Sequence, residues 1–387
     1  MNRQPLSLER FRAEYRNAVD GASRDQVLSD FWKEVADRGT PLIEADGNTV
    51  VFLFRGNDDS VKLTGDMTGW NTQLPLSRCE GTDLFSLKMS FPADARLDYM
   101  FVVDTGNTVL DPCNPRSVMG GFGPKSELAM PGFRQAPELE KHTDVPAGTL
   151  TTVTHSSAIL KYEHTLYVYL PAGYESGANR YPVVYFQDGS DYLELAYAGR
   201  TLDNVIAGGS IQPVMAVFVV PPIASDRNRT TEYRMNELYA KFFASELAPF
   251  IDAQYRTLPR AQHRLVIGPS SGGLASLLIA FRYPEVFGLA ASQSGFVSFG
   301  GDSIITLFES MPRRPLRLYI DAGVYETAVR PAGGDEENFL QANRRLRDVL
   351  IAQGYGAEYR EFQDGHSWGR WRNELPSILR LFFAWRP

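Results

Sequence analysis

A serine between glycines stands at residue 270, in the run Gly268-Pro269-Ser270-Ser271-Gly272. This G-x-S-x-G pattern is typical of a nucleophilic serine held at a sharp turn between a strand and a helix. The apolar run 265–267 precedes the motif, and a helical pattern follows it from about Leu274. Side chains two positions before and after the serine would collide in such a turn, which explains the two glycines. We therefore predict that Ser270 is the nucleophile of an acyl-transfer reaction.

A nucleophilic serine needs a general base, and the chain has only five histidines: His142, His155, His164, His263 and His366. In one large class of serine hydrolases the chain order is serine, then acid, then histidine. Only His366 follows Ser270, and it lies in a loop between a strand-like segment and the C-terminal helical pattern. His366 is therefore the predicted base, and the other four histidines are assigned surface or packing roles.

The third member of such a triad is a carboxylate that orients the imidazole and stabilises its protonated form. It usually follows the strand after the nucleophile's helix, and here the apolar run 316–320 is followed by acidic residues. Glu326 is our first choice for the acid, Asp321 the second and Asp335 the third. The sequence leaves these alternatives open.

The developing negative oxygen of an acyl-transfer reaction needs two backbone N–H donors. One is expected just after the nucleophile, at Ser271. Ser271 is also the competing nucleophile, but it lacks glycines at its own flanking positions. The other donor is expected in the loop 187–190 after the apolar strand 183–186, at Ser190. Gly189 would allow a tight turn there.

The N-terminal part of the chain must fold apart from this machinery, because 387 residues exceed the size of a single growing core. Residues 6–39 have apolar positions at helical spacing, broken near 21–23, and predict two short helices. From residue 49 short runs alternate at strand spacing and predict an antiparallel, immunoglobulin-like β-sandwich. We interpret 104–147 as loop and linker, and place the domains at 1–145 and 146–387.

The C-terminal part has continuous apolar strands that alternate with helical patterns, which is typical of a mostly parallel sheet covered on both faces. We predict an α/β fold, specifically an α/β-hydrolase domain. The candidate strands are 166–170, 183–186, 214–220, 265–267 and 316–320, and the clearest helical patterns are 236–253, 272–283 and 336–353.

Composition excludes several classes of protein. A net charge of −7 argues against nucleic-acid or anionic-membrane partners, which require a basic face. No stretch approaches the roughly 18 apolar residues of a membrane span. Two cysteines, Cys79 and Cys113, exclude a disulfide framework and a four-cysteine zinc site. The predicted acyl-transfer reaction requires no metal and no organic cofactor. Met1–Leu6 lack the apolar core of a secretory signal, which favours a cytoplasmic location.

Several motifs resemble the enterochelin (ferric enterobactin) esterases and the wider group that contains feruloyl esterases and mycolyltransferases. The motifs are 181–189, 229–233 (Arg-Thr-Thr-Glu-Tyr), 268–273, 283–288, 292–295 (Ser-Gln-Ser-Gly) and 364–366 (Asp-Gly-His) with Trp368 and Trp371. The N-terminal third also resembles the first domain of enterochelin esterases, through 31–35 and 39–44. The resemblance implies hydrolysis of a catecholate siderophore trilactone, a small-molecule ester, with release of iron inside the cell.

A ferric catecholate is anionic, so the resemblance implies cationic residues near the substrate. Arg227, Arg229 and Arg234 are the candidates, with a solvated or ion-paired arginine as the alternative for each. Trp368 and Trp371 are candidates for stacking on catechol rings, although aromatic residues at helical spacing usually belong to the core.

Residues 65–70, which end at Trp70, also resemble a glycogen-binding type of sandwich, in which that tryptophan is either structural or ligand-binding.

Three other functions stay open. They are hydrolysis of feruloyl or acetyl esters on carbohydrate, acyl transfer to an alcohol, and a non-catalytic ligand-binding protein.

Overall fold

The computed structural model describes residues 6–104 and 106–385. It divides into two compact units, the first formed by Met1–Arg134 with Gln363–Gly365 and the second by Gln135–Phe362 with His366–Pro387. The three residues before His366 thus belong to the first unit, although they lie far along the chain. Residues 1–5, on which the expectation of no secretory signal partly rests, lie outside the described residues.

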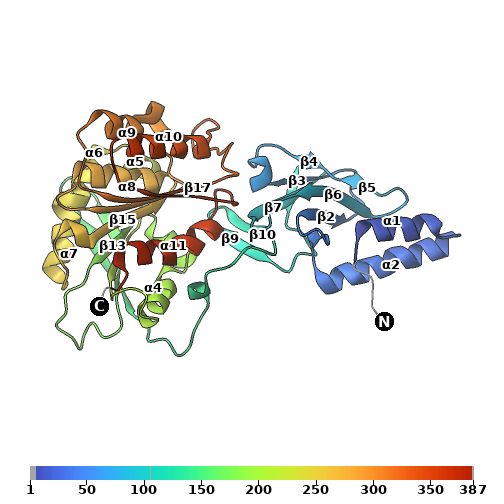
Figure 1. The fold of residues 1–387 in the computed structure, drawn as a ribbon, viewed down its shortest axis with the longest axis horizontal. Helices are drawn as coiled ribbons and strands as arrows, with labels where there is room; N and C mark the ends of the chain where they lie inside the picture. Colours follow the sequence, from blue (N-terminus) through green and yellow to red (C-terminus); the bar gives the residue numbers. More distant parts are fainter. Residues whose placement is uncertain (1–5, 105, 386–387) are drawn as a thin grey trace. The chain divides into compact units, whose positions relative to one another are not determined.

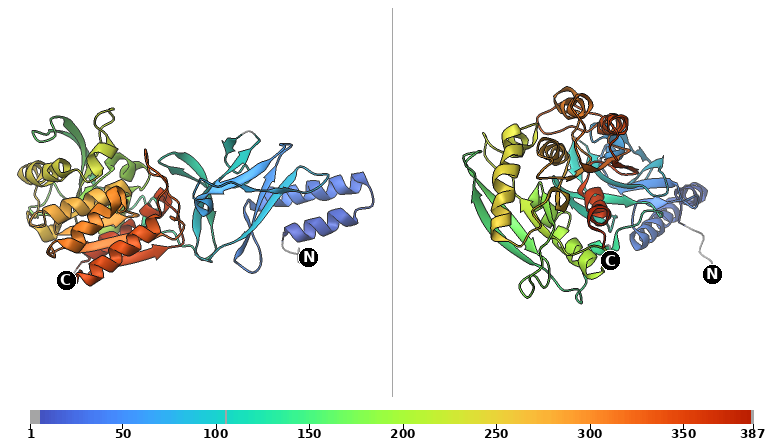
Figure 2. Two further views of the ribbon diagram at one scale, coloured as in Figure 1. Left: turned by 90° about the horizontal axis from the view of Figure 1, so that it is seen from above. Right: turned by 60° about the vertical axis from the view of Figure 1, so that its left-hand side comes forward.

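Two N-terminal helices, α1 (Leu8–Asn17) and α2 (Gly21–Arg38), lie side by side in the first unit (Figure 2). The turn signal at 21–23 is the first turn of α2, because the side chain of Asp20 caps it by accepting a 2.7 Å hydrogen bond from the Ser23 N–H. The apolar positions predicted from helical spacing, among them Phe11, Phe31 and Val35, are buried.

The rest of the first unit consists of two antiparallel sheets with orders β1-β2-β6-β5 and β4-β3-β7-β10-β9, with β8 beside β7. Their apolar faces meet, since Phe52 contacts Tyr99 edge-on at 5.0 Å and Phe54 contacts Phe101 at 5.3 Å. The strands are β1 (Leu42–Ile43), β2 (Thr49–Arg55), β3 (Val61–Gly65), β4 (Leu74–Pro75), β5 (Ser77–Arg78), β6 (Leu84–Ser90), β7 (Arg96–Val103), β8 (Asn107–Val109), β9 (Ser117–Gly120) and β10 (Gly123–Ala129).

The prediction that 104–147 is only loop and linker was wrong, because β8, β9 and β10 lie within it. Glycines at 120 and 123 and Pro124 interrupt the alternation of polar and apolar residues there. β10 becomes a strand by hydrogen bonding along β7, a pairing that local patterning does not reveal.

Trp70 follows the short 3-10 helix η1 (Asp66–Thr68). Its side chain is 37% exposed. The indole N–H donates a 2.9 Å hydrogen bond to the Asp66 carboxylate, and Lys125 lies 5.0 Å from the ring centre. The residue thus has a structural contact and an exposed face.

The second unit is built on an eight-stranded sheet of order β11-β12-β14-β13-β15-β16-β17-β18. The strands from β14 to β18 pair in parallel, while β11 and β12 are antiparallel to their neighbours. The strands are β11 (Thr149–Ser156), β12 (Glu163–Leu170), β13 (Val183–Phe186), β14 (Met215–Val219), β15 (Arg264–Pro269), β16 (Leu289–Gln293), β17 (Arg317–Gly323) and β18 (Glu358–Phe362). Every predicted strand of this unit is present, while β11 and β16 were not predicted and β18 was anticipated only as the strand-like segment before His366.

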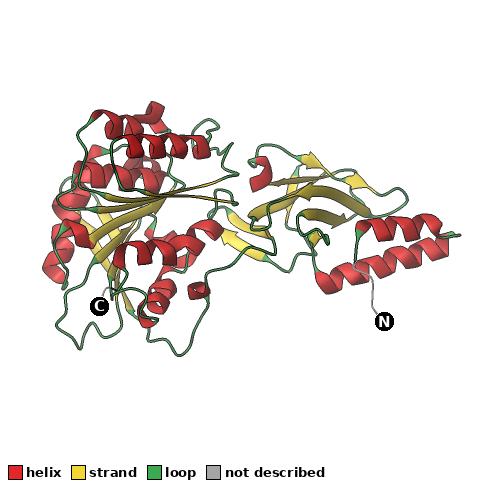
Figure 3. Ribbon diagram, viewed as in Figure 1, coloured by secondary structure: helices red, strands yellow, loops and turns green. Residues whose placement is uncertain are grey.

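Helices cover both faces of this sheet (Figures 1 and 3). Val183 and Tyr185 of β13 face the core that contains α6, α7, α8 and α10, whereas Val184 and Phe186 face α3, α4 and α11. The helices are α3 (Gly189–Glu194), α4 (Ala198–Ala207), α5 (Arg229–Tyr233), α6 (Glu237–Phe242), α7 (Ala248–Gln254), α8 (Ser271–Arg282), α9 (Phe299–Ser310), α10 (Phe339–Ala352) and α11 (Trp368–Phe383). Burial on both sides explains why the central strands are apolar throughout.

In residues 6–104 and 106–385, no helix combines the length and the apolar character needed to cross a membrane.

Candidate active site

Ser270 lies in a strained turn between β15 and α8, with φ of 55° and ψ of −123°. A non-glycine residue persists in such a conformation only when its surroundings enforce it. Its N–H donates to the Gln293 carbonyl at 2.8 Å, and its own carbonyl accepts from the N–H groups of Gly273 at 3.0 Å and Phe296 at 2.9 Å. The turn is thus anchored to the end of the neighbouring strand β16.

The flanking glycines are required by close packing. A Cβ on Gly268 would clash with the backbone of Gly272, and a Cβ on Gly272 would lie 3.0 Å from the Cβ of Gln187. The steric reason predicted for these two glycines is therefore confirmed.

His366 lies just before α11, and its Nδ1 is 3.4 Å from Oε1 of Glu326. Glu326 is fully buried, whereas the His366 side chain is 20% exposed. The contact is within ion-pair range but outside hydrogen-bond geometry, and neither carboxylate oxygen of Glu326 has another hydrogen-bond donor among the described residues. The imidazole packs edge-on against Phe339 at 5.0 Å and Trp371 at 4.9 Å.

The other two candidate acids are placed differently. Asp321 accepts hydrogen bonds from the Ser294 N–H and the Tyr319 hydroxyl, both at 2.9 Å. Burial raises the pKa of Asp321 to about 7. Asp335 is exposed. Of these three described carboxylates, only Glu326 makes an ion-pair contact with His366.

Both predicted oxyanion donors lie in the first turn of a helix, Ser271 at the start of α8 and Ser190 at the second position of α3. First-turn N–H groups have no acceptor within their own helix and point toward the region where negative charge is stabilised. Gly189 is needed for more than a turn, since a Cβ there would clash with the backbone of Phe218 and Val219. β13 and β15 are neighbours in the sheet, so both helices begin at the same edge.

Residues 157–382 match the model of a protein family described as "Putative esterase". The chain belongs to this esterase family. An iron(III) enterobactin esterase of Dickeya dadantii is 24% identical over 409 residues, covering 89% of this chain and 90% of that protein. The resemblance to enterobactin esterases noted in the sequence is thereby confirmed.

Solved structures show the same fold. The enterobactin esterase of Shigella flexneri, crystallised in the presence of enterobactin, superposes with a TM-score of 0.72 at 20% identity, covering 86% of this chain and 92% of that one. A ferulic acid esterase of Anaeromyces mucronatus superposes with a TM-score of 0.52 at 19% identity, covering 64% and 96%. The prediction of a mixed α/β fold is confirmed by these matches.

Arg229 of this esterase-family chain is already engaged by protein groups. Its Nε and one terminal nitrogen donate to the two carboxylate oxygens of Asp188, at 2.6 and 2.8 Å, and that terminal nitrogen also lies 3.3 Å from the Pro269 carbonyl oxygen. Asp188 precedes α3 and Pro269 precedes Ser270, so Arg229 ties the loop of one expected oxyanion donor to the turn that carries Ser270. This arrangement favours the ion-paired alternative for Arg229.

The other two candidate arginines differ from each other. Arg227 is exposed and lies 5.3 Å from the centre of the Tyr162 ring. Arg234 donates to the Ala332 carbonyl at 2.5 Å and lies 5.4 Å from the ring centre of Phe296. Burial, with the nearby Arg229, lowers the pKa of Arg234.

Trp368 and Trp371 are both buried in the core between α11 and the sheet. They meet edge-on at 5.0 Å, and Trp368 also meets Tyr192 at 5.2 Å. The structure therefore supports the core alternative over stacking on a substrate ring. Trp371 nevertheless contacts His366, which gives it a place at the site.

Sequence reasoning missed the residues that support the loop 187–190, which carries the expected oxyanion donor Ser190. The Tyr239 hydroxyl donates to the Gln187 side chain at 2.7 Å, and the Asp188 N–H donates to the Tyr233 hydroxyl at 2.8 Å. Gln187, Asp188 and Tyr233 lie in motifs that carried the family resemblance, but no chemical role followed from their types. Only contacts between distant segments reveal it.

In the described part of the chain, no group of three or more His, Cys, Asp or Glu side chains is placed to hold a metal ion.

Proposed function

We propose that this chain is a serine carboxylic-ester hydrolase that works through an acyl-enzyme, with Ser270 as nucleophile, His366 as base and Glu326 as acid. The observation that carries the proposal is the fully buried Glu326 carboxylate, which lies 3.4 Å from Nδ1 of His366 and has no hydrogen-bond donor among the described residues. A buried carboxylate without a donor is costly, and it becomes compensated when the neighbouring imidazole gains a proton. This is the charge change that a general base undergoes.

The architecture of the second unit supports the same assignment, and we infer that it is an α/β-hydrolase domain. The nucleophile follows β15, the acid follows β17 and the base follows β18, in the order serine, acid, histidine. The carboxyl ends of parallel strands lie at one edge of the sheet, so these three loops share that edge.

The reaction proceeds in two halves. Ser270 Oγ transfers its proton to His366 Nε2 and attacks the ester carbonyl, whose oxygen becomes negative between the N–H groups of Ser190 and Ser271. His366 then returns the proton to the leaving alcohol as the C–O bond breaks. Water, deprotonated by His366, attacks the acyl-enzyme and releases the acid and free Ser270.

As substrate we propose a catecholate siderophore trilactone, whose iron is cargo rather than a cofactor. The named relatives that align over most of the chain support this substrate class. Of the three candidate arginines, Arg227 is exposed, and Arg234 donates a hydrogen bond to the backbone carbonyl of Ala332. These two are better placed than Arg229 to meet an anionic ligand.

The nucleophile is tested with a short-chain p-nitrophenyl ester. Ser270→Ala should abolish turnover, whereas Ser271→Ala should keep it, because the proposed role of Ser271 is in its backbone N–H. Loss of turnover in Ser271→Ala with retention in Ser270→Ala would refute the assignment.

The substrate is tested by mass spectrometry of a siderophore trilactone incubated with the protein. Linear trimer, dimer and monomer should appear, and Ser270→Ala should leave the trilactone intact. An unchanged trilactone, together with turnover of the p-nitrophenyl ester, would refute the substrate class while leaving the chemistry standing.

The ferulic acid esterase fold match supports a second candidate, hydrolysis of feruloyl or acetyl groups on carbohydrate. Methyl ferulate given in parallel with the trilactone separates the two by their relative kcat/KM. Adding an alcohol acceptor would reveal acyl transfer as a new ester product, and binding of the trilactone without turnover would indicate the non-catalytic alternative.

A further inference from the structure

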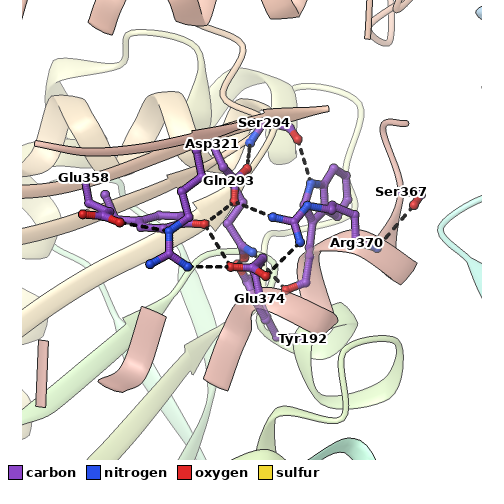
Figure 4. Close-up of polar contacts among 11 residues, drawn as sticks. Tyr192, Gln293, Ser294, Asp321, Glu358, Ser367, Arg370 and Glu374 are labelled. Atoms are coloured by element: carbon purple, nitrogen blue, oxygen red, sulfur yellow. Dashed lines mark hydrogen bonds and ion pairs between the residues drawn. The ribbon is translucent and has the colours of Figure 1, made fainter. Parts of the chain in front are cut away.

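Buried polar groups join the ends of β16 and β17 to α11 (Figure 4). We call Gln293, Ser294, Asp321 and Trp371 the strand-end network. Gln293 is the last residue of β16, Ser294 follows it, and Asp321 lies in β17 beside Gln293. All four side chains are buried.

Gln293 connects the nucleophile turn to α11. Its carbonyl accepts the Ser270 N–H at 2.8 Å, and its side-chain amide donates to the Trp371 carbonyl at 2.9 Å. Its amide oxygen accepts from the Tyr192 hydroxyl at 2.6 Å. Gln293 therefore contacts both Ser270 and the first turn of α11, and holds the two in a fixed relation.

Ser294 is held in a left-handed conformation, with φ of 48°. Asp321 enforces it, because the Ser294 N–H donates to both the Asp321 carboxylate at 2.9 Å and the Asp321 carbonyl at 3.1 Å. In that conformation, Ser294 Oγ accepts the Trp371 indole N–H at 3.0 Å. Non-glycine residues adopt this backbone only where surrounding contacts compensate the strain.

Asp321 is itself supported by neighbours from β17 and α11. The Tyr319 hydroxyl donates to its carboxylate at 2.9 Å, and a terminal nitrogen of Arg370 lies 3.8 Å away. Arg370 also pairs with Glu374 at 3.1 Å, as Figure 4 shows. The carboxylate is thus fixed from β17 and from α11.

The network ends at the base. Trp371 meets the His366 ring edge-on, with centroids 4.9 Å apart and an interplanar angle of 89°. The hydrogen bond from the indole to Ser294 sets the tilt of the Trp371 ring. The Trp371 ring in turn packs against one side of the His366 imidazole.

We propose that Asp321, Ser294 and Trp371 are positioning residues, which hold the His366 imidazole in register with Ser270. This inference rests on the proposed function, because it assigns an orienting role toward the proposed base. Glu326 supplies a negative charge beside Nδ1 of His366, and the strand-end network fixes the orientation of the imidazole ring. Small misplacements of a catalytic group cost up to about 100-fold in rate.

The test removes the hydrogen bond from either side, with Ser294→Ala or Trp371→Phe. Each should lower kcat for the p-nitrophenyl ester by about tenfold with KM within about twofold, since the substrate's binding groups are unchanged. The double variant should fall no further than either single, because both remove the same contact.

Trp32→Phe is the matched control. Trp32 lies in the first unit, is 5% exposed like Trp371, and donates an indole hydrogen bond of the same 3.0 Å to Asp83. Trp32→Phe should lower the free energy of unfolding as much as Trp371→Phe does, but it should not lower kcat. An equal fall in kcat for Trp32→Phe would show that the effect at Trp371 is loss of folded protein and would overturn the proposal.

A readout without turnover separates this inference from the proposed function. The NMR signal of the His366 ring, assigned with His366→Asn, should shift in Ser294→Ala and Trp371→Phe, because the neighbouring indole changes its ring current. It should stay in place in Trp32→Phe. An unshifted signal in Ser294→Ala, or fully additive losses of kcat in the double variant, would refute the positioning role, whereas absent turnover in the wild type refutes only the function.

Discussion

Arg229 donates two hydrogen bonds of 2.6 and 2.8 Å to the Asp188 carboxylate and a third of 3.3 Å to the Pro269 carbonyl. The pair joins the loop before α3 to the turn that carries Ser270. Its geometry depends on the planar, two-pronged guanidinium, which an ammonium group cannot reproduce.

Arg229→Lys should therefore lower kcat/KM by about tenfold or more, as the loop with the Ser190 N–H loses its register. Arg344→Lys is the control, because Arg344 makes a similar two-pronged pair with Glu361 at 2.8 and 2.7 Å and has a similar side-chain exposure, 39% against 37%. Steady-state kinetics should show no more than about a twofold effect there. Equal effects of the two variants would contradict a specific role for Arg229.

Replacement of the candidate acids should single out Glu326. Glu326→Gln keeps the volume but removes the charge that stabilises the imidazolium, so kcat should fall by about 1,000-fold or more. Asp335→Ala should change kcat by less than about twofold, because Asp335 is exposed. A larger loss in Asp335→Ala than in Glu326→Gln, measured on protein of equal thermal stability, would reassign the acid.

Asp321 should make stability depend on pH. Its pKa is raised from 3.8 to about 7 in the folded state, first by burial. The folded protein therefore binds this proton more tightly than the unfolded chain, and the stabilisation is fully present below about pH 4 and lost as the pH rises through about 7.

Denaturant unfolding from pH 4 to 8 checks this behaviour. The unfolding free energy of the wild type relative to Asp321→Asn should fall by up to a few kcal/mol across that range. Comparison of the two proteins cancels the titration of the other groups. A difference that is constant with pH, or that rises with it, would show that Asp321 does not hold a proton in the folded state.

The glycine at 268 should tolerate no side chain. Gly268→Ala places a Cβ against the backbone of Gly272, and we expect a loss of about 1–3 kcal/mol in unfolding free energy together with loss of turnover. Gly356→Ala is the control, because a Cβ there meets nothing within 4 Å, and its effect should stay within about 0.5 kcal/mol. Thermal denaturation of the two variants under the same conditions tests whether the added methyl group destabilises the protein at position 268 and not at 356.

Chemistry that depends on neighbours in the sequence was readable from the residues. The glycines around Ser270 report a local steric constraint, so the motif and its strand and helix predicted the turn that the structure shows. His366 followed by elimination, since chain order left one histidine after the serine. Five strands of the second unit were likewise visible, because burial on both sheet faces leaves continuous apolar runs.

Local patterning ranked Glu326 first but left Asp321 open, since both come shortly after the apolar run 316–320 and differ in what surrounds them after folding. It did not show that Arg229 is held by Asp188, nor that β9 and β10 are strands, because these follow from pairing with distant segments.

The sequence by itself determined the α/β class and predicted the nucleophile and its base, all of which rest on local sterics and residue order. Only the tertiary structure decided which carboxylate lies next to the imidazole. It also showed that Trp371, a candidate for stacking on the substrate, instead packs against His366. The reason is physical: burial, ion pairing and ring contacts arise between segments far apart in the chain.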